Sequence, residues 1–408
     1  MRLTSALRST AGISALCVLA CSVLAPLSVA ADTELRFTTG LRAMTDSNAG
    51  LDPTSLGRSN SLGLRLGMEL VSETTISRLA FAASGTLRMS SGVDNGATGF
   101  VTPNAALSYT RTAANADLSL NAGLTEADLD DDSVTSLTTG PGTRRTSTVS
   151  GAINWGTSAP LGFGATASLT DLAYQDAPGL TGNRRIRLGA SVRADLSQVL
   201  TLTLGVNQSR FDPDDGSAVR DTHSLDAGLT LARPRSTLGL TLGLDDTEDG
   251  GRERLTFRHQ IELPEEAALS YSLGVTQGVD GDNFVTASLA YQRTFALGQL
   301  AVDISRDVTS SDTTDAETVQ NRASIGWQQE VTPTGSLALA LDWAESTATA
   351  TDLATSNTRL SATWRQSLAQ DWALDLGYAH RIRDEDGVGK GDSDQVFLEL
   401  RRDFSTKF

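Results

Sequence analysis

The side chains that could act as a catalytic base are few in this chain of 408 residues. Its three histidines, His223, His259 and His380, lie far apart in the sequence. His259 shares an alternating face with Phe257 and Ile261, with no serine beside it to activate as a nucleophile. Scattered histidines also lack the spacing of a transition-metal site. We therefore expect no catalytic residue, no cofactor and no metal, and the sequence does not indicate an enzyme.

Acidic residues gather in short segments that could bind a cation. The three clusters are Asp128/Asp130/Asp131/Asp132, Asp212/Asp214/Asp215 and Asp245/Asp246/Glu248/Asp249. None of them has the alternate ligand positions and the glycine of a calcium-binding loop. We interpret the clusters as solvated loops, which divalent cations could bridge loosely to an anionic surface.

Arginines on alternating positions could select anions. Three segments contain eight such residues: Arg185, Arg187 and Arg193; Arg252, Arg254 and Arg258; Arg359 and Arg365. Rows of basic side chains along strands can guide anionic solutes through a pore. Alternatively, these arginines pair with acids on the same face and hold the wall together. The sequence leaves both interpretations open.

These segments belong to a pattern of alternation that runs through the chain. In Asn60–Ser72, Leu62, Leu64 and Leu66 share one parity, whereas serine, glycine and charged residues occupy the other. About ten residues of such alternation predict a strand with one apolar and one polar face. The pattern recurs about twenty times, from residues 34–42 to residues 394–408, and eighteen strands would also fit.

The connections between these segments are alternately short and long. The longer ones are rich in Asp, Gly, Ser and Thr, and they include residues 43–59, 126–144, 246–251 and 382–393. This arrangement, without intervening helices, predicts an all-β fold: a transmembrane up-and-down antiparallel β-barrel. A soluble β-sandwich or solenoid would leave the many leucine faces uncovered. Because the first connection is long, we expect both termini to be periplasmic and the long loops to be extracellular.

The first thirty residues have the form of an export signal. Arg2 and Arg8 precede an apolar stretch at residues 11–24, and Ser28-Val29-Ala30 offers small residues for cleavage. We expect a signal peptide at 1–30 and the barrel at 31–408; a lipoprotein signal ending at Cys21 fits less well. Without the signal the formal charge falls from −16 to −18, because 31 basic residues then face 49 acidic ones. Such acidity argues against nucleic acid as a partner.

The last strand carries a recognisable pattern. Leu398, Leu400, Phe404 and the terminal Phe408 share one parity in QVFLELRRDFSTKF, although Arg402 and Thr406 interrupt it. This segment resembles the terminal assembly signal of Gram-negative outer-membrane proteins, and the whole chain resembles porin-like barrels in general. The resemblance implies the bacterial outer membrane as location. It implies the barrel-assembly machinery, outer-membrane lipid and lipopolysaccharide as partners.

Two functions are compatible with these features. The first is a pore that passes small hydrophilic solutes, or a secreted polymer such as a polysaccharide, through a polar lumen. The second is a non-conducting barrel that acts as an envelope scaffold or binds partners through its acidic loops. A plug domain is not expected, because the first strand begins within a few residues of the predicted cleavage site. Residues 43–59 and 126–144 are long enough to fold inward. The sequence does not indicate an oligomeric state.

Overall fold

A computed structural model describes residues 32–92, 98–129, 142–279, 281–310 and 317–408. Within these residues there are twenty strands, and no helix is long and apolar enough to cross a membrane. The strands are β1 (Asp32–Asp46), β2 (Ser59–Glu73), β3 (Ser77–Gly92), β4 (Gly99–Ala113), β5 (Ala116–Asp128), β6 (Thr143–Trp155), β7 (Leu161–Gln175), β8 (Asn183–Asp195), β9 (Leu200–Pro213), β10 (Arg220–Arg233), β11 (Ser236–Thr247), β12 (Gly250–Leu263), β13 (Ala267–Gln277), β14 (Asn283–Phe295), β15 (Gly298–Ser310), β16 (Glu317–Thr332), β17 (Gly335–Ala348), β18 (Ala354–Ala369), β19 (Trp372–Glu385) and β20 (Gly389–Lys407).

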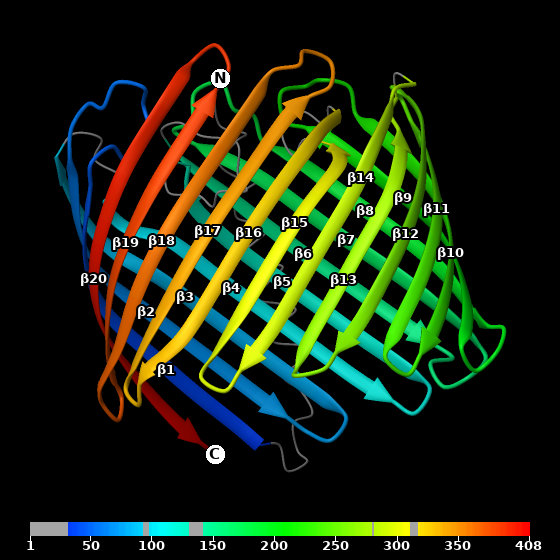
Figure 1. The fold of residues 1–408 in the computed structure, drawn as a ribbon, viewed down its shortest axis with the longest axis horizontal. Coiled ribbons are helices and arrows are strands. Elements are labelled where there is room, and N and C mark those ends of the chain that lie inside the picture. The colour runs from blue at the N-terminus through cyan, green and yellow to red at the C-terminus, as the bar shows by residue number, and fades with distance from the viewer. Residues whose placement is uncertain (1–31, 93–97, 130–141, 280, 311–316) are drawn as a thin grey trace, which may run out of the picture.

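The strands form one closed antiparallel barrel. Each strand pairs with its neighbours in the chain, and β1 pairs with β20 to close the sheet. Figure 1 shows the tilted strands, with β10–β20 on the near wall and β1–β9 behind them. In the closing pair Glu34 lies opposite Lys407, so β1 begins and β20 ends at the same end of the barrel. We call this the terminal end and the opposite one the loop end. The predicted barrel of about twenty strands is confirmed.

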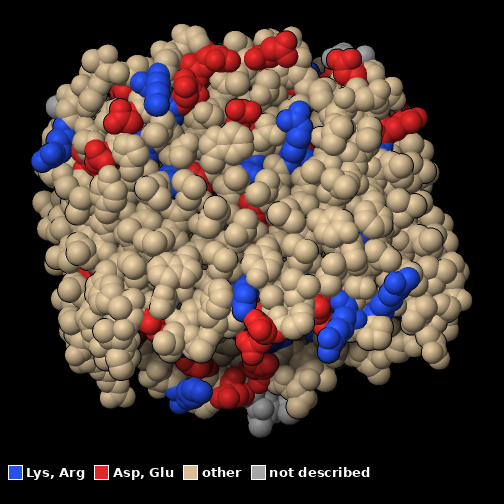
Figure 2. Space-filling model, in the orientation of Figure 1, with Lys and Arg blue, Asp and Glu red and all other residues tan. Residues whose placement is uncertain are grey.

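The apolar parity of each strand faces outward. In β11, Leu240 lies opposite Leu229 of β10 and Phe257 of β12, so that apolar side chains meet across three strands. Leu240 is 48% exposed in the isolated chain, which is typical of side chains that lipid would cover. Figure 2 shows the result on one face, where charged residues gather toward the two ends and a belt largely without them lies between.

Connections at the terminal end are short, whereas those at the loop end vary. Residues 234–235 link β10 to β11 and residues 370–371 link β18 to β19, while residues 47–58 link β1 to β2 at the loop end. Two of the predicted long loops are wrong. Only residues 248–249 and 386–388 separate their strands, because the ladder continues to pairs such as Asp384 with Lys390. Beyond the lipid both faces of a hairpin are wet, so the strands lose the alternation that identified them.

The outward register predicts a face-dependent effect of charge within a single strand. Leu240→Arg places a charge in the middle of the belt and should destabilise the barrel by about 2–4 kcal/mol, whereas Thr241→Arg faces the lumen and should cost far less. Urea unfolding of each variant in lipid vesicles measures both changes. Equal losses for these two adjacent positions would contradict the register.

Candidate functional site

The inner wall is built from the polar parity of all twenty strands. On β5–β10 this parity lines a hollow of about 400 Å³, where hydroxyl and amide side chains surround one guanidinium. Its lining includes Ser119, Asn121, Thr166, Arg187 and Asn207. Such groups can exchange hydrogen bonds with water or with a hydroxylated solute. The wall can therefore hold a hydrated path along the barrel.

The three groups of candidate arginines stand on separate parts of this wall. They lie on β8, β12 and β18, with three strands between the first two groups and five between the last two. All eight have the parity opposite to that of the apolar residues in their strands. They therefore form short rows on different walls, and the fold does not gather them into one constriction.

Arg254 and Arg365 are held by acids on nearby strands. Arg365 donates from Nε and Nη2 to the two oxygens of Asp375, at 2.7 and 3.0 Å. Arg254 lies between two acids, with Nη2 at 3.3 Å from Asp226 and 3.1 Å from Asp245. These pairs neutralise charge within the wall, because each guanidinium is at hydrogen-bond distance from a carboxylate.

Two arginines of β8, Arg193 and Arg185, have different surroundings. Arg193 donates to the carbonyl oxygens of Gly156 and Ala159 at 2.9 and 2.8 Å, and so holds the turn between β6 and β7. The guanidinium of Arg185 lies 4.9 Å from the ring centroid of Phe211, which is buried on the inner side of β9. Both side chains are thus positioned by the wall itself.

Two candidates remain without such a partner. Within the described part of the chain, the side chains of Arg258 and Arg359 have neither a hydrogen bond nor an ion pair. Arg359 lines a second hollow of the inner wall, of about 510 Å³, together with Asp303, Arg322 and Asp342. Their charges are therefore the ones most directly available to a passing solute.

At the loop end, the connection between β1 and β2 packs on the inner face of β19 and β20. The Asp46 carboxylate accepts a 2.6 Å bond from Arg381 and further bonds from Ser393 and Gln395. Asn48 donates to the carbonyl oxygen of Asp392 at 3.0 Å. Asp46 is 1% exposed and Arg381 8%. Residues 47–58 therefore lie against the lumen side of the mouth, as the length of this loop allows.

Two further buried ion pairs cross the mouth. Arg88 of β3 bonds to Asp128 at the end of β5. Arg252 of β12 reaches Glu317 of β16 at 2.7 Å, although three strands stand between them. The side chains of the second pair are 11% and 4% exposed. Together with the Arg381–Asp46 pair, these contacts fasten the rim from three sides.

The structure describes the predicted acidic clusters only in part. Residues 130–132 lie outside the described residues, and within the described part there is no group of three or more acids, histidines or cysteines placed to hold a metal. In the loop after β9, hydrogen bonds from the Ser217 side chain and amide lower the pKa of Asp215. Asp249 pairs with Arg220 at 2.9 Å.

The three histidines all have outward parity. His259 Nδ1 is 3.1 Å from the hydroxyl of Tyr271, and His380 Nδ1 is 2.9 Å from Asp394. His223 lines a hollow on the outer wall. None of these rings faces the lumen, so none adds a titrating group to the polar path.

The predicted assembly segment forms one side of the closing seam. Leu398, Leu400 and Phe404 face outward, and Phe404 lies opposite Phe37 of β1. Phe408 follows the last strand and donates its amide to the carbonyl oxygen of Thr33 at 2.9 Å. The segment is therefore placed where strand addition closes the barrel.

No protein-family model and no curated protein matches the chain. Solved structures do. A variant of the ferric enterobactin receptor of Pseudomonas aeruginosa is 12% identical, with a TM-score of 0.51, over 92% of this chain and 81% of that chain. The copper transporter OprC is 11% identical (TM-score 0.49; 92% and 80% covered), and OccAB4 of Acinetobacter baumannii is also 11% identical (TM-score 0.42; 91% and 98% covered).

The similarity between this chain and the ferric enterobactin receptor concerns the fold alone. Together with the closed sheet and the apolar belt, it shows that this chain has the architecture of Gram-negative outer-membrane β-barrel proteins. The predicted all-β barrel class is thereby confirmed. The family within that class is not assigned.

The buried rim contacts predict that one arginine holds the first loop. Arg381→Ala leaves Asp46 buried without its partner, and loss of one member of a buried ion pair costs about 3–5 kcal/mol. We expect residues 47–58 to detach from β19 and β20. A spin label at Leu56→Cys, in protein expressed from residue 31 and so free of other cysteines, should become more mobile.

Arg365→Ala is the matched control for this measurement. It removes an arginine that also pairs with an acid of β19, but away from the loop. The label should report no change in that background. Unaltered label mobility in Arg381→Ala would contradict the anchoring role of the ion pair.

Proposed function

We propose that this protein is an outer-membrane pore for small hydrophilic solutes or for a secreted polymer. The observation that carries the proposal is the continuous polar inner parity of a closed barrel of twenty strands. Barrels of sixteen to eighteen strands enclose aqueous channels, and twenty strands give a wider circumference. The hydroxyl-lined hollow on β5–β10 supports polar, uncharged groups as part of the cargo.

The charge of the lumen supports only mild ionic selectivity. Arg254 and Arg365 are neutralised by adjacent acids, whereas Arg258 and Arg359 have no such partner within the described residues. Isolated cations on the wall attract anions most strongly at low salt, because screening over about 8–10 Å weakens them at higher ionic strength. The hollow that contains Arg359 also contains Asp303 and Asp342, so the wall offers charges of both signs and the expected preference for either sign is weak.

A non-conducting scaffold is the second candidate. It is favoured by the three buried ion pairs that fasten the rim and by the loop of residues 47–58 on the lumen side. A rim held together by buried ion pairs is compatible with a static binding surface and also with a permanently open pore. Electrical conductance separates the two functions.

The proposal includes an orientation and an assembly route. We place both termini in the periplasm and the loop end outside the cell, after removal of residues 1–30. The barrel-assembly machinery would recognise Leu398, Leu400, Phe404 and Phe408. An epitope inserted after Gly216 should bind antibody on intact cells, while one inserted after Thr334 should bind only after permeabilisation. The reverse pattern would overturn the orientation.

Planar bilayers test the pore directly. Folded, heat-modifiable protein should give stable stepwise conductance. In a salt gradient, Arg185→Glu combined with Arg187→Glu should shift the reversal potential toward cation preference, because two lumen cations become anions. The permeability ratio should change several-fold at low salt and less at high salt.

Arg306→Glu provides the control, since Arg306 lies on the outward parity of β15. Its reversal potential should equal that of the unaltered protein. Absence of conductance in folded protein would exclude the pore and leave the scaffold. Conductance with an unchanged reversal potential in the double variant would exclude the β8 arginines from selectivity.

A further inference from the structure

Four charged side chains of alternating sign share one hollow of the inner wall. Asp303 of β15, Arg322 of β16, Asp342 of β17 and Arg359 of β18 line this hollow, which has a volume of about 510 Å³. We call these four residues the mixed-charge group. Each of them lies at least five residues from both ends of its strand. A solute that crosses the lumen in either direction therefore passes this level of the wall.

The four charges do not neutralise one another by direct contact. Among the residues that the structure describes, the side chains of Asp303, Asp342 and Arg359 have neither a hydrogen bond nor an ion pair. Arg322 donates to the neutral side-chain amide of Gln320. Two carboxylates and two guanidinium groups are thus directed at the same space without a charged partner in the wall.

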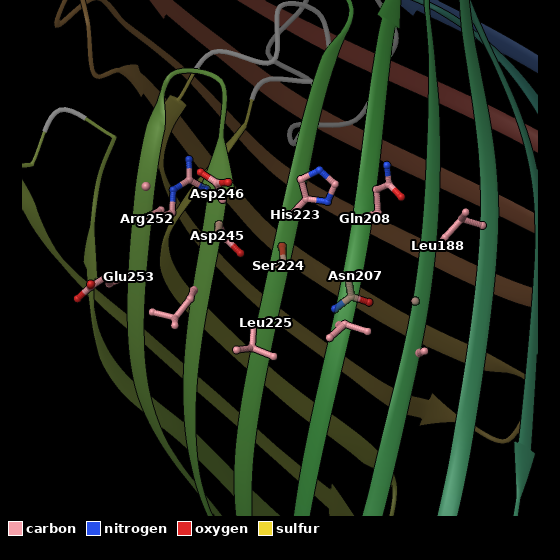
Figure 3. A pocket seen from close by; sticks show the side chains of 15 residues that line it. Leu188, Asn207, Gln208, His223, Ser224, Leu225, Asp245, Asp246, Arg252 and Glu253 are labelled. Atoms are coloured by element: carbon pink, nitrogen blue, oxygen red, sulfur yellow. The ribbon is translucent and has the colours of Figure 1, made fainter.

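Several other acids and arginines of the inner wall are paired. Asp245 of β11, labelled in Figure 3, accepts a bond from Arg254 at 3.1 Å. Arg381, which lies opposite Arg359 in the ladder of β18 and β19, donates to Asp46 at 2.6 Å. The mixed-charge group therefore differs from these pairs, because its charges remain available to a ligand.

The order of the charges disfavours a site for a single ion. The acids stand on β15 and β17 and the arginines on β16 and β18, so like charges are two strand spacings, roughly 9–10 Å, apart. Two like side chains could converge on one ion only across a charge of the opposite sign. Neighbouring strands, in contrast, offer one carboxylate and one guanidinium, as where Asp342 lies directly opposite Arg359. The arrangement suits a solute that carries both charges.

The neutral part of the lining favours a peptide-like solute. Ser288, Ser305, Ser324 and Ser361 line the same hollow, and their hydroxyl groups can exchange hydrogen bonds with peptide N–H and C=O groups. The two Cα atoms of a dipeptide are about 3.8 Å apart, so its charged ends are separated by at least roughly one strand spacing of about 4.8 Å. Its ammonium group can thus reach an acid while its carboxylate reaches the arginine of the next strand.

We propose that the mixed-charge group binds zwitterionic solutes, namely amino acids and short peptides, inside the lumen. The ammonium group would bind Asp303 or Asp342, and the carboxylate would bind Arg322 or Arg359. This inference rests on the proposed pore, because it names a class of solute for that pore. Binding itself can be measured without conductance.

An NMR titration of the folded barrel in nonionic detergent measures this binding. The probe is glycylglycine, and the reference is N-acetylglycinamide, which has nearly the same backbone without charges. Glycylglycine should bind about five-fold more tightly, because ion pairs that remain in contact with water each contribute modestly. N-acetylglycine keeps only the carboxylate. Its binding should weaken in Arg359→Gln but not in Asp342→Asn.

A double variant tests the group itself. Asp342→Asn combined with Arg359→Gln removes one charge of each sign and should weaken glycylglycine binding by about five-fold. Arg401→Gln combined with Asp403→Asn is the matched control, because it removes an acid and an arginine of β20 that are already paired at 3.4 Å. This control should bind glycylglycine like the unaltered protein, and heat-modifiability should show that every variant is folded.

Two results would overturn the proposal. The first is equal binding of glycylglycine and N-acetylglycinamide by the unaltered barrel, and the second is full binding of glycylglycine by the Asp342→Asn, Arg359→Gln variant. Conductance in planar bilayers is measured independently of this titration, so the pore and the zwitterion site can fail separately.

Discussion

The pairing of β1 with β20 joins residues 34–46 to residues 395–407 and leaves the sheet without a free edge. In hydrocarbon each unpaired backbone group costs several kcal/mol, so a sheet can lie in a membrane only when every strand has two neighbours. The last strand, which resembles an assembly signal, lies at this seam, with Phe404 against Phe37. Closure therefore determines which residues meet across the two ends of the chain, and the polar lumen exists because of it.

Alternation within each strand and closure of the sheet act together. The apolar face of a strand can contact lipid only if the polar face of the same strand has a polar space to face. The closed barrel provides that space. Exceptions are local. Arg402 has outward parity on β20, but its guanidinium lies 4.4 Å from the ring of Phe404 and 5.2 Å from that of Trp372, which places the charge over aromatic faces near the terminal end. Inside the barrel, Gly377 has no side chain, and the ring of Phe397 occupies the position that a Cβ would need.

The limits of prediction follow from the same physics. The register of β11 could be predicted residue by residue, because one of its faces must be apolar and a shift by one residue would turn it inward. The hairpin tip at Asp384 and Lys390 could not, because no lipid contacts it and its sequence is that of a loop. The arginines of β8, β12 and β18 could be assigned to the lumen, but whether each has a partner depends on side chains of neighbouring strands, as for Arg365 and Asp375.

The sequence by itself determined the strands, their inward and outward faces, the count of about twenty and the barrel they form, since these depend on contacts with lipid and water that each residue makes locally. Tertiary structure decided which side chains pair with one another at the rim of the loop end. Arg381 and Asp46 are 335 residues apart in the chain, and Arg252 and Glu317 stand on strands that are not neighbours. Such pairs leave no periodic signal, because only the closed barrel and the inward fold of residues 47–58 bring them together.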